Sequence, residues 1–508
     1  MSGPQLLQDD PHDAALLAAV HPPDWQNPAP AARYDLVVLG AGTGGLVSAA
    51  VAAGLGARVA LVERALMGGD CLNVGCVPSK AVIHAGRLVA GARAAAVLGM
   101  APAAAAQPDF ATAMEHMRAV RAAIGPHDSA RRFRDELGVD VFFGEGRFVA
   151  PDAAEVDGRR LRFRRAVVAT GARAGAPPIP GLAEAGFLTN ESIFTLRERP
   201  ARLAVIGGGP IGCELAQAFS RLGVEVTLLE AAPRLLVRDD PEAGALVAAA
   251  LARDGVRVVT AAKIEGVARD GDRRRVRWSG PEGAGAADEP FDQLLVAAGR
   301  IPNVENLGLE AAGVAFDPRR GVTVDDFLRT ANRRVYAVGD CAMDAKFTHA
   351  ADAAAKLVVQ NALFFGRKRV SKLVIPWCTY TDPEVAHVGL TLDDAARQGI
   401  AIDTYTVPMS ANDRARTEGE TEGFARIHTR KGKDAIAGAT IVGPGAGEQI
   451  ALVSTAMTAG LGLGALAGTI LPYPTRSEAV KAAANAYMRT RLTPTAKKVL
   501  GWVLRLPR

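Results

Sequence analysis

The chain has 508 residues, of which 49% are hydrophobic and 22% charged, and its net charge is +5. This length exceeds one hydrophobic core and predicts about three domains of a soluble globular protein. The mild charge gives no reason to expect a nucleic-acid partner, and no run of 18 apolar residues predicts a transmembrane helix. Five cysteines are too few for a disulfide framework, so we expect a reducing compartment and a cytoplasmic protein.

The first 30 residues are rich in Ala, Pro and Asp, and their acidic, polar start does not fit a signal peptide. We interpret residues 21–25 as an extended arm whose Trp25 docks on the body of the protein. Disorder of this segment is an equal alternative.

A dinucleotide-binding pattern follows. Residues 34–39 form an apolar run typical of a buried parallel strand and lead into Gly40, Gly42 and Gly45. The first glycine permits a tight turn, the second lets a diphosphate approach the backbone, and the third lets helix and strand pack closely. A second strand ends at Glu63, 18 residues after Gly45, where a carboxylate can hold a ribose hydroxyl. The order of these elements predicts a Rossmann-like nucleotide site.

Two cysteines five positions apart, Cys71 and Cys76, come next. Pro78 suits the first turn of a helix, so Cys76 should lie at or just before a helix N-terminus. That end of a helix favours a thiolate and lowers its pKa, and Cys71 on a glycine-flanked loop can fold back to pair with it. The stretch predicts a redox-active dithiol, and two unrelated buried cysteines are the alternative.

The stretch from Gly68 to Lys80 resembles the active-site signature of the flavoprotein disulfide reductases, such as lipoamide dehydrogenase, glutathione reductase and mercuric reductase. The resemblance extends over about residues 34–487 and implies a class I FAD-dependent pyridine nucleotide-disulfide oxidoreductase. It makes Cys76 the flavin-proximal thiol and Cys71 the interchange thiol that meets the substrate. It also places Lys80 near the reactive edge of the flavin.

Further segments match the flavin domain of this class. Residues 86–135 predict one or two helices, and residues 139–148 and 155–163 predict strands. The resemblance assigns further residues to flavin binding: Thr170, Gly171, Arg300 and Asp340, with Gly299 where the chain returns to this domain. It makes Asp340 the residue that hydrogen-bonds the ribityl chain of the flavin. For Asp340, an aspartate in a strand-end turn is the alternative.

A second nucleotide motif contains Gly207, Gly209 and Gly212, and Glu230 again follows the last glycine by 18 residues. The resemblance assigns FAD to the first motif and NAD(P)H to the second. Glu230 favours NADH because a carboxylate there repels the 2′-phosphate of NADPH, although the nearby Arg234 softens this preference.

In the family, the acid at the position of Glu214 pairs with the active-site lysine, which is Lys80 here. Two unrelated, solvated charges are the alternative.

From residue 374 the sequence alternates like antiparallel strands, with helical stretches at 449–458 and 477–489, and resembles the interface domain through which two subunits pair. The predicted fold is therefore α/β, with two Rossmann-like dinucleotide-binding domains and a C-terminal α+β dimerisation domain. The predicted segments are an N-terminal arm (1–30), an FAD-binding domain (31–182 and 299–370), an NAD(P)-binding domain (183–298), an interface domain (371–490) and a basic tail (491–508).

One departure from the family pattern bears on the substrate. Lipoamide and glutathione reductases carry a His, with a Glu five residues on, as base and orienter in the partner subunit's active site. Here Glu478 is present but Tyr473 stands at the His position. A tyrosine with a pKa of about 10 is a poor base and a good hydrogen-bond donor. Oxidation of a dithiol needs a base, whereas reduction of a thiolate-held metal ion does not, and mercuric reductases are similar to this chain in having Tyr here.

The sequence thus predicts a homodimeric, mercuric reductase-like enzyme that passes electrons from NAD(P)H through FAD and the Cys71–Cys76 disulfide to a small-molecule or metal-ion acceptor, without a resident metal site. A dihydrolipoyl dehydrogenase-like enzyme and a membrane-associated electron-transfer flavoprotein are the alternatives. Three features differ from those of typical mercuric reductases. No cysteine follows Cys378, the N-terminus lacks a cysteine pair for metal capture, and Glu230 favours NADH where mercuric reductases usually take NADPH.

The tail beyond residue 493 is basic and mildly amphipathic, with Lys497, Lys498, Arg505 and Arg508 among apolar residues. We expect a terminal helix packed on its own subunit, and a helix on an acidic membrane surface is the alternative.

Overall fold

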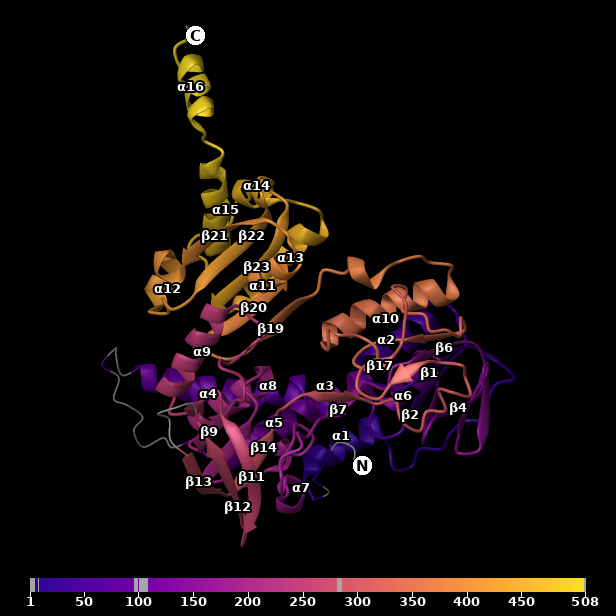
Figure 1. Cartoon of the computed structure of the whole chain (residues 1–508). Coiled ribbons are helices and arrows are strands. Elements are labelled where there is room, and N and C mark those ends of the chain that lie inside the picture. The colour runs from indigo at the N-terminus through magenta and orange to yellow at the C-terminus, as the bar shows by residue number, and fades with distance from the viewer. Residues whose placement is uncertain (1–4, 8, 96–98, 100–107, 281–285, 507–508) are drawn as a thin grey trace. The chain divides into compact units, whose positions relative to one another are not determined.

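The computed structural model describes residues 5–7, 9–95, 99, 108–280 and 286–506 (Figure 1). It divides into two compact units, one of residues 1–231 with 254–373 and the other of residues 232–253 with 374–508. Each unit is described by itself. The mixture of parallel nucleotide-binding sheets and an antiparallel C-terminal sheet confirms the predicted fold class.

The first sheet of the first unit has the order β3-β2-β1-β6-β5-β4, with β18 also pairing with β6. Its strands are β1 (Tyr34–Leu39), β2 (Val59–Glu63), β3 (Asp140–Phe143), β4 (Arg147–Ala150), β5 (Ala153–Val156), β6 (Arg159–Val168) and β18 (Val335–Ala337). β1 and β2 pair in parallel and are almost wholly buried, which explains their continuous apolar runs. Helices α2 (Thr43–Gly54) and α10 (Thr348–Leu363) pack against each other beside this sheet (Figure 1).

Two strand predictions in this sheet were too long. The run 139–148 is split into β3 and β4, and Gly144 between them has a φ of 141° that only glycine adopts readily. The run 155–163 is split into β5 and β6 by a tight turn in which Asp157 and Gly158 both have positive φ. Turn geometry, not hydrophobicity, decides these boundaries.

A second parallel sheet of the same unit has the order β10-β9-β8-β14, and a three-stranded antiparallel sheet lies next in the chain. The strands are β8 (Arg202–Ile206), β9 (Glu225–Leu229), β10 (Arg257–Val259), β11 (Lys263–Asp270), β12 (Arg273–Ser279), β13 (Ala286–Phe291) and β14 (Gln293–Val296). Further helices of the first unit are α4 (Cys76–Ala94), α5 (Phe110–Ile124), α6 (Ala130–Asp135), α7 (Leu182–Ala185) and α8 (Pro210–Arg221). The short strand pairs are β7 (Ala172–Ala174) with β15 (Arg300–Pro302), and β16 (Phe316–Asp317) with β17 (Gly321–Val322).

The N-terminal segment differs from the predicted arm. Residues 11–20 are neither extended nor disordered but form helix α1 (Pro11–Val20), whose N-cap Asp10 accepts hydrogen bonds from two backbone N–H groups of the first turn. An Asp N-cap followed by proline is a helix-start signal that the composition of this segment obscured.

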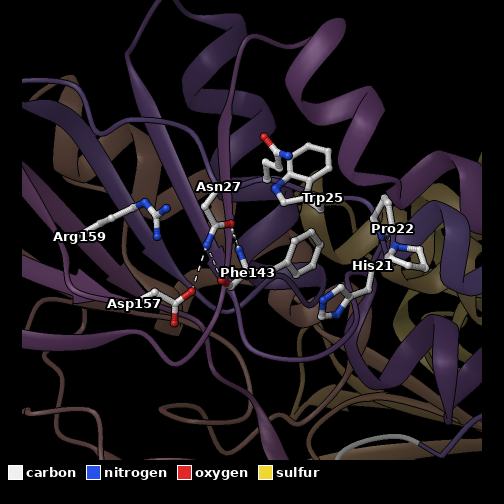
Figure 2. A pocket seen from close by; sticks show the side chains of 9 residues that line it. His21, Pro22, Trp25, Asn27, Phe143, Asp157 and Arg159 are labelled. Atoms are coloured by element: carbon white, nitrogen blue, oxygen red, sulfur yellow. Dashed lines mark hydrogen bonds between the residues drawn. The ribbon is translucent and has the colours of Figure 1, made fainter.

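The residues after α1 dock on the edge strand β3 (Figure 2), but the prediction that residues 21–25 are extended is wrong. They form a turn in which the N–H of Trp25 donates to the carbonyl oxygen of Pro22 at 3.0 Å, because Pro23 presets the φ that the second position of a turn requires. Trp25 donates from Nε1 to the carbonyl oxygen of Val141 at 3.2 Å, so the predicted docking of this side chain is confirmed. Asn27 exchanges hydrogen bonds with the backbone of Phe143 and also donates to Asp157. These contacts cover the otherwise unpaired edge of the first sheet.

The second unit is built on an antiparallel sheet of order β19-β20-β23-β22-β21. Its strands are β19 (Pro376–Thr379), β20 (Glu384–Gly389), β21 (Ile402–Pro408), β22 (Phe424–Arg430) and β23 (Ile436–Gly443). Its helices are α9 (Pro241–Arg253), α11 (Leu392–Arg397), α12 (Asp413–Glu418), α13 (Ala446–Thr458), α14 (Leu463–Gly468), α15 (Glu478–Thr490) and α16 (Pro494–Val503).

Helix α9 lies inside the segment predicted as the NAD(P)-binding domain but packs within this second unit. Arg426 of β22 holds it through ion pairs of 2.6 Å to both Asp240 and Glu242. None of the helices in the described ranges is both long and apolar enough to cross a bilayer.

Candidate functional site

Residues 68–80, here called the redox loop, connect β2 to helix α4 through the short helix α3 (Gly69–Asn73). Helix α4 begins at Cys76, as the position of Pro78 predicts, and Gly75 is its N-cap. A Cβ on Gly75 would lie 2.7 Å from the carbonyl oxygen of Asp70, so only glycine lets the loop fold back on itself here. The backbone therefore brings Cys71 and Cys76 together.

The two cysteines are free thiols in this structure and have different electrostatic environments. The hydrogen bond from Cys71, together with Thr348 and the charge of Lys80, lowers the pKa of Cys76 to about 6, against the opposing effect of burial. Thr348 contributes through its hydroxyl, which lies 3.4 Å from Cys76 Sγ. The pKa of Cys71 is raised because its proton is held by Cys76 and because it is partly buried. At neutral pH the pair holds one thiolate, on Cys76, and one thiol.

The ion pair expected between Lys80 and Glu214 is present in the structure. Lys80 Nζ lies 2.9 Å from Glu214 Oε2, and the Glu214 side chain is only 6% exposed. The pair joins helix α4 to helix α8, which cross closely because Gly86 lets Ala218 approach its backbone. Glu214 thereby holds a positive charge one helical turn from Cys76.

The first glycine loop has the geometry of a diphosphate cradle. A Cβ on Gly40 would lie 2.4 Å from the carbonyl oxygen of Ala169, and one on Gly45 would lie 1.8 Å from that of Gly40. Helix α2 starts at this loop without a side-chain cap, so its first N–H groups are left for an anion. Glu63 is buried, which raises its pKa, and it accepts the N–H groups of Ala41 and Ala65. These residues fit the diphosphate and ribose of a dinucleotide such as FAD.

A charged cluster lies beside the redox loop. Arg300 pairs with Asp70, the residue before Cys71, and with Asp340 at 3.1 Å, and it donates to the carbonyl oxygen of Ala172 at 2.8 Å. Burial raises the pKa of Asp340, and the charge of Arg300 opposes that effect. The predicted residues Arg300 and Asp340 are thus brought together, and Asp70 is a member that sequence reasoning missed.

The other predicted flavin segment is held in place by Asn303. Its side-chain amide donates to the backbone carbonyl oxygen of Thr170 at 3.0 Å, and its backbone carbonyl oxygen accepts from the Thr170 hydroxyl at 2.6 Å. Gly171 and Gly299 both have positive φ, which glycine tolerates. Two turns that are far apart in sequence therefore meet beside the first sheet.

The second glycine loop repeats the first. A Cβ on Gly212 would lie 1.8 Å from the carbonyl oxygen of Gly207, and helix α8 also starts without a side-chain cap, after Gly209. Glu230 accepts the N–H of Gly208 at 2.5 Å. This loop fits a second dinucleotide. Arg234, which was expected to soften the coenzyme preference, donates to the carbonyl oxygens of residues 236, 237 and 239.

A buried support under the redox loop was also missed. Arg121 of α5 donates to the carbonyl oxygen of Asn73 at 2.6 Å and pairs with Asp13 of α1, and both charged side chains are 1% exposed. One turn away, Arg118 pairs with Asp10 at 2.6 Å. In the sequence, the two acids are three residues apart and so are the two arginines, which places each pair on one face of its helix. This spacing indicates two ion pairs only once α1 and α5 are known to pack together.

Two predicted site residues, Tyr473 and Glu478, belong to the second unit. Tyr473 is 72% exposed and donates from its hydroxyl to Asp413 at 3.2 Å, and this hydrogen bond raises the pKa of Tyr473. Glu478 accepts the N–H of Thr475 at 3.3 Å. The hydroxyl of Tyr473 is thus oriented by Asp413, a residue that the sequence motif did not indicate.

Comparison with known proteins places this geometry in a family. The model of the pyridine nucleotide-disulphide oxidoreductases matches residues 34–356, and the model of their dimerisation domain matches residues 375–484. The chain belongs to this family. This disulphide oxidoreductase is 36% identical over 459 residues to a mercuric reductase from Bacillus cereus, a match that covers 89% of the chain and 71% of the relative. It is also 36% identical over 462 residues to a dihydrolipoyl dehydrogenase from Thermus scotoductus, covering 89% and 97%.

Solved structures agree. The HOCl-induced flavoprotein disulfide reductase RclA from Escherichia coli has a TM-score of 0.78 at 28% identity, covering 89% of this chain and 99% of that one. LpdA from Mycobacterium tuberculosis has a TM-score of 0.80 at 26% identity, with the same coverage. The chain is therefore an FAD-dependent oxidoreductase that uses NAD(P)H, and its dimerisation domain supports a homodimer.

Proposed function

We propose that this disulphide oxidoreductase is mercuric reductase-like and delivers electrons from NADH to Hg²⁺ or a similar thiol-bound oxidant. The proposal rests on the presence of Tyr473 at the position where the lipoamide and glutathione reductases, which this chain resembles, have a histidine base. Its exposed hydroxyl is committed as a donor to Asp413, and its pKa is raised, so it cannot serve as a base at neutral pH.

The residues of the first unit have definite tasks in this scheme. The glycine loop, Glu63 and the Arg300–Asp340 cluster would hold FAD, which when bound carries two electrons from the nicotinamide to the Cys71–Cys76 disulfide. Lys80, held by Glu214, stabilises the thiolate of Cys76 after reduction. Cys71, which holds the proton of the reduced pair, would meet the acceptor and release that proton as its sulfur binds the metal ion.

The chemical balance requires no base from Tyr473. The hydride of one NADH converts the disulfide to the thiolate of Cys76 and the thiol of Cys71. Hg²⁺ then takes the two electrons and leaves as the metal atom, while the disulfide re-forms and one proton is released. The ion would be met by the cysteine pair, because the described residues contain no group of three or more His, Cys, Asp or Glu side chains placed to hold a metal.

A dihydrolipoyl dehydrogenase-like activity is the second candidate. It is favoured by the Thermus scotoductus relative, which is as similar to this chain as the Bacillus cereus mercuric reductase is. The two candidates differ in whether the enzyme must deprotonate a dithiol substrate, and that difference can be measured.

The test compares the wild-type enzyme with Tyr473→His and Tyr473→Phe. Each is assayed with Hg²⁺, dihydrolipoamide, oxidised glutathione and quinones. A general base typically accelerates a reaction by about 10²–10⁴-fold. Tyr473→His should therefore increase the rate of dihydrolipoamide oxidation by a factor that approaches this range, and Tyr473→Phe should not increase it. Reduction of the flavin by NADH is the internal control and should be unchanged. Wild-type oxidation of dihydrolipoamide as fast as flavin reduction would refute the proposal.

A further inference from the structure

We propose that helix α16 is an amphipathic element that docks the enzyme on an anionic phospholipid surface. It is the last helix of the described chain, follows α15 directly (yellow in Figure 1), and lies beyond residue 484, where the match to the family's dimerisation domain ends. The inference does not depend on the electron acceptor proposed above.

The apolar side of α16 has no partner in its own unit. None of its residues is buried. Val499 and Trp502 are 55% and 64% exposed, and Leu504, the C-cap residue that continues the helical backbone, is 82% exposed. Positions three and four apart share a helix face, so Val499 and Val503 lie on one line and Leu500 and Leu504 on the next. The helix therefore presents a broad apolar face with Trp502 at its border.

The opposite side of α16 is basic. Lys497 and Lys498 of the helix are exposed, as is Arg505, two residues beyond its end. Glu478 is the last acidic residue of the sequence, and the 30 residues after it contain seven Lys or Arg, a larger charge than the net +5 of the whole chain. One of the seven, Arg508, lies outside the described residues.

This combination favours lipid over protein as the occupant. A helix with Trp and aliphatic residues on one face and Lys on the other lies in the plane of a membrane interface and is drawn to anionic headgroups. Ten residues span about 15 Å, about half the apolar thickness of a bilayer, so α16 would lie on the surface and not cross it. A second copy of the chain is disfavoured because its own tail carries the same positive charge.

The dimer expected from the family would strengthen this contact. One short amphipathic helix binds a membrane weakly, but two helices on one dimer act together once the first is bound. In a cytoplasmic enzyme the matching surface is the inner leaflet, which carries anionic lipids.

The first test is co-sedimentation of the full-length enzyme with vesicles of phosphatidylcholine alone or mixed with phosphatidylglycerol. We expect binding only to the anionic vesicles, with a loss as salt is raised. Lys497→Gln combined with Lys498→Gln should weaken binding about tenfold or more, and Leu504→Asp should abolish it. The matched control is Lys431→Gln with Lys433→Gln, which removes two exposed lysines from the turn between β22 and β23 and should bind like wild type.

A second readout locates the contact. Among the tryptophans, Trp502 is an exposed side chain whereas Trp278 is buried, so insertion of α16 should shift tryptophan emission to shorter wavelength. Trp502→Phe should bind the vesicles but lose this shift. The proposal is overturned if the wild-type enzyme does not bind anionic vesicles, or if the Lys431→Gln, Lys433→Gln control weakens binding as much as Lys497→Gln with Lys498→Gln does. It is also overturned if Leu504→Asp converts the dimer to a monomer in analytical ultracentrifugation.

Discussion

The two dinucleotide folds of this enzyme have nearly the same glycine loop in different surroundings. In both, a Cβ on the last motif glycine, Gly45 or Gly212, would lie 1.8 Å from the carbonyl oxygen of the first motif glycine. In both, the acid that ends the second strand accepts an N–H of the loop. The middle glycines differ, because Gly42 lies against Gly69 of the redox loop, whereas no described atom approaches within 4 Å of the Cβ position of Gly209.

The difference indicates how each site is used. The N–H of Gly68 donates to the carbonyl oxygen of Ala41, so the first glycine loop is fastened to the redox loop. Glu63 is 9% exposed, whereas Glu230 is only half-buried. A closed loop suits a cofactor that stays bound, and an open one suits a coenzyme that must enter and leave at each turnover. We therefore expect the same local motif to serve a resident cofactor in the first fold and an exchanging coenzyme in the second.

The largest expected effect comes from filling the third glycine position. Gly45→Ala should yield protein without FAD, because a methyl group 1.8 Å from a backbone oxygen cannot be accommodated without breaking the turn. Gly212→Ala should retain FAD but lose reduction by NADH. The measurements are the ratio of flavin absorbance to protein and stopped-flow reduction, with dithionite as a chemical control. If Gly212→Ala lost as much FAD as Gly45→Ala, the assignment of different cofactors to the two folds would be contradicted.

The next effect concerns the redox loop that closes the first fold. Because the pKa of Cys76 is lowered to about 6, Cys76 of the two-electron-reduced enzyme is a thiolate above that pH and becomes a thiol as the pH falls through it. Below the pKa, the thiolate fraction falls about tenfold for each further pH unit. The long-wavelength thiolate-to-flavin charge-transfer band should follow this titration.

Variants of the two cysteines assign the band. Cys76→Ser should abolish it, while Cys71→Ser should retain it in the enzyme as isolated. Cys71→Ala, which removes the hydrogen-bond donor, should move the titration to higher pH than Cys71→Ser does. Identical behaviour of the Cys71 and Cys76 variants would show that the roles are assigned wrongly.

The smallest effect is coenzyme choice at the open site. Wild type should be reduced by NADH with a specificity constant about 10- to 100-fold above that for NADPH, the range of a single-group contact, and Glu230→Gln should narrow the ratio. Glu63→Gln is the matched variant in the first fold and should leave the ratio unchanged. The check is stopped-flow flavin reduction with each coenzyme, and a wild-type preference for NADPH would reject the role of Glu230.

Much of the architecture is readable from local patterns. Buried strands that lead into glycines, an acid after the second strand and a cysteine before proline depend on steric rules acting over a few residues, and the structure has each of these elements where the pattern indicates it. The family, the fold class and the type of enzyme followed from these motifs. Boundaries that depend on tight turns, as at Gly144 and Asp157, did not, because runs of apolar residues do not reveal positive φ.

What the sequence by itself determined is therefore the chemistry available: two nucleotide folds, a dithiol at a helix start and a tyrosine in place of a base. Only the tertiary structure decided which charges meet. Arg300 joins Asp70 to Asp340 across 230 and 40 positions of the chain, Arg121 supports the redox loop through Asp13, and Asp413 orients Tyr473 from 60 residues away. Such pairs leave no local signature, because the partners lie far apart in the sequence and each is an ordinary polar residue until folding brings the two together. For the buried Arg121 and Asp13, removal from water also makes a specific partner necessary.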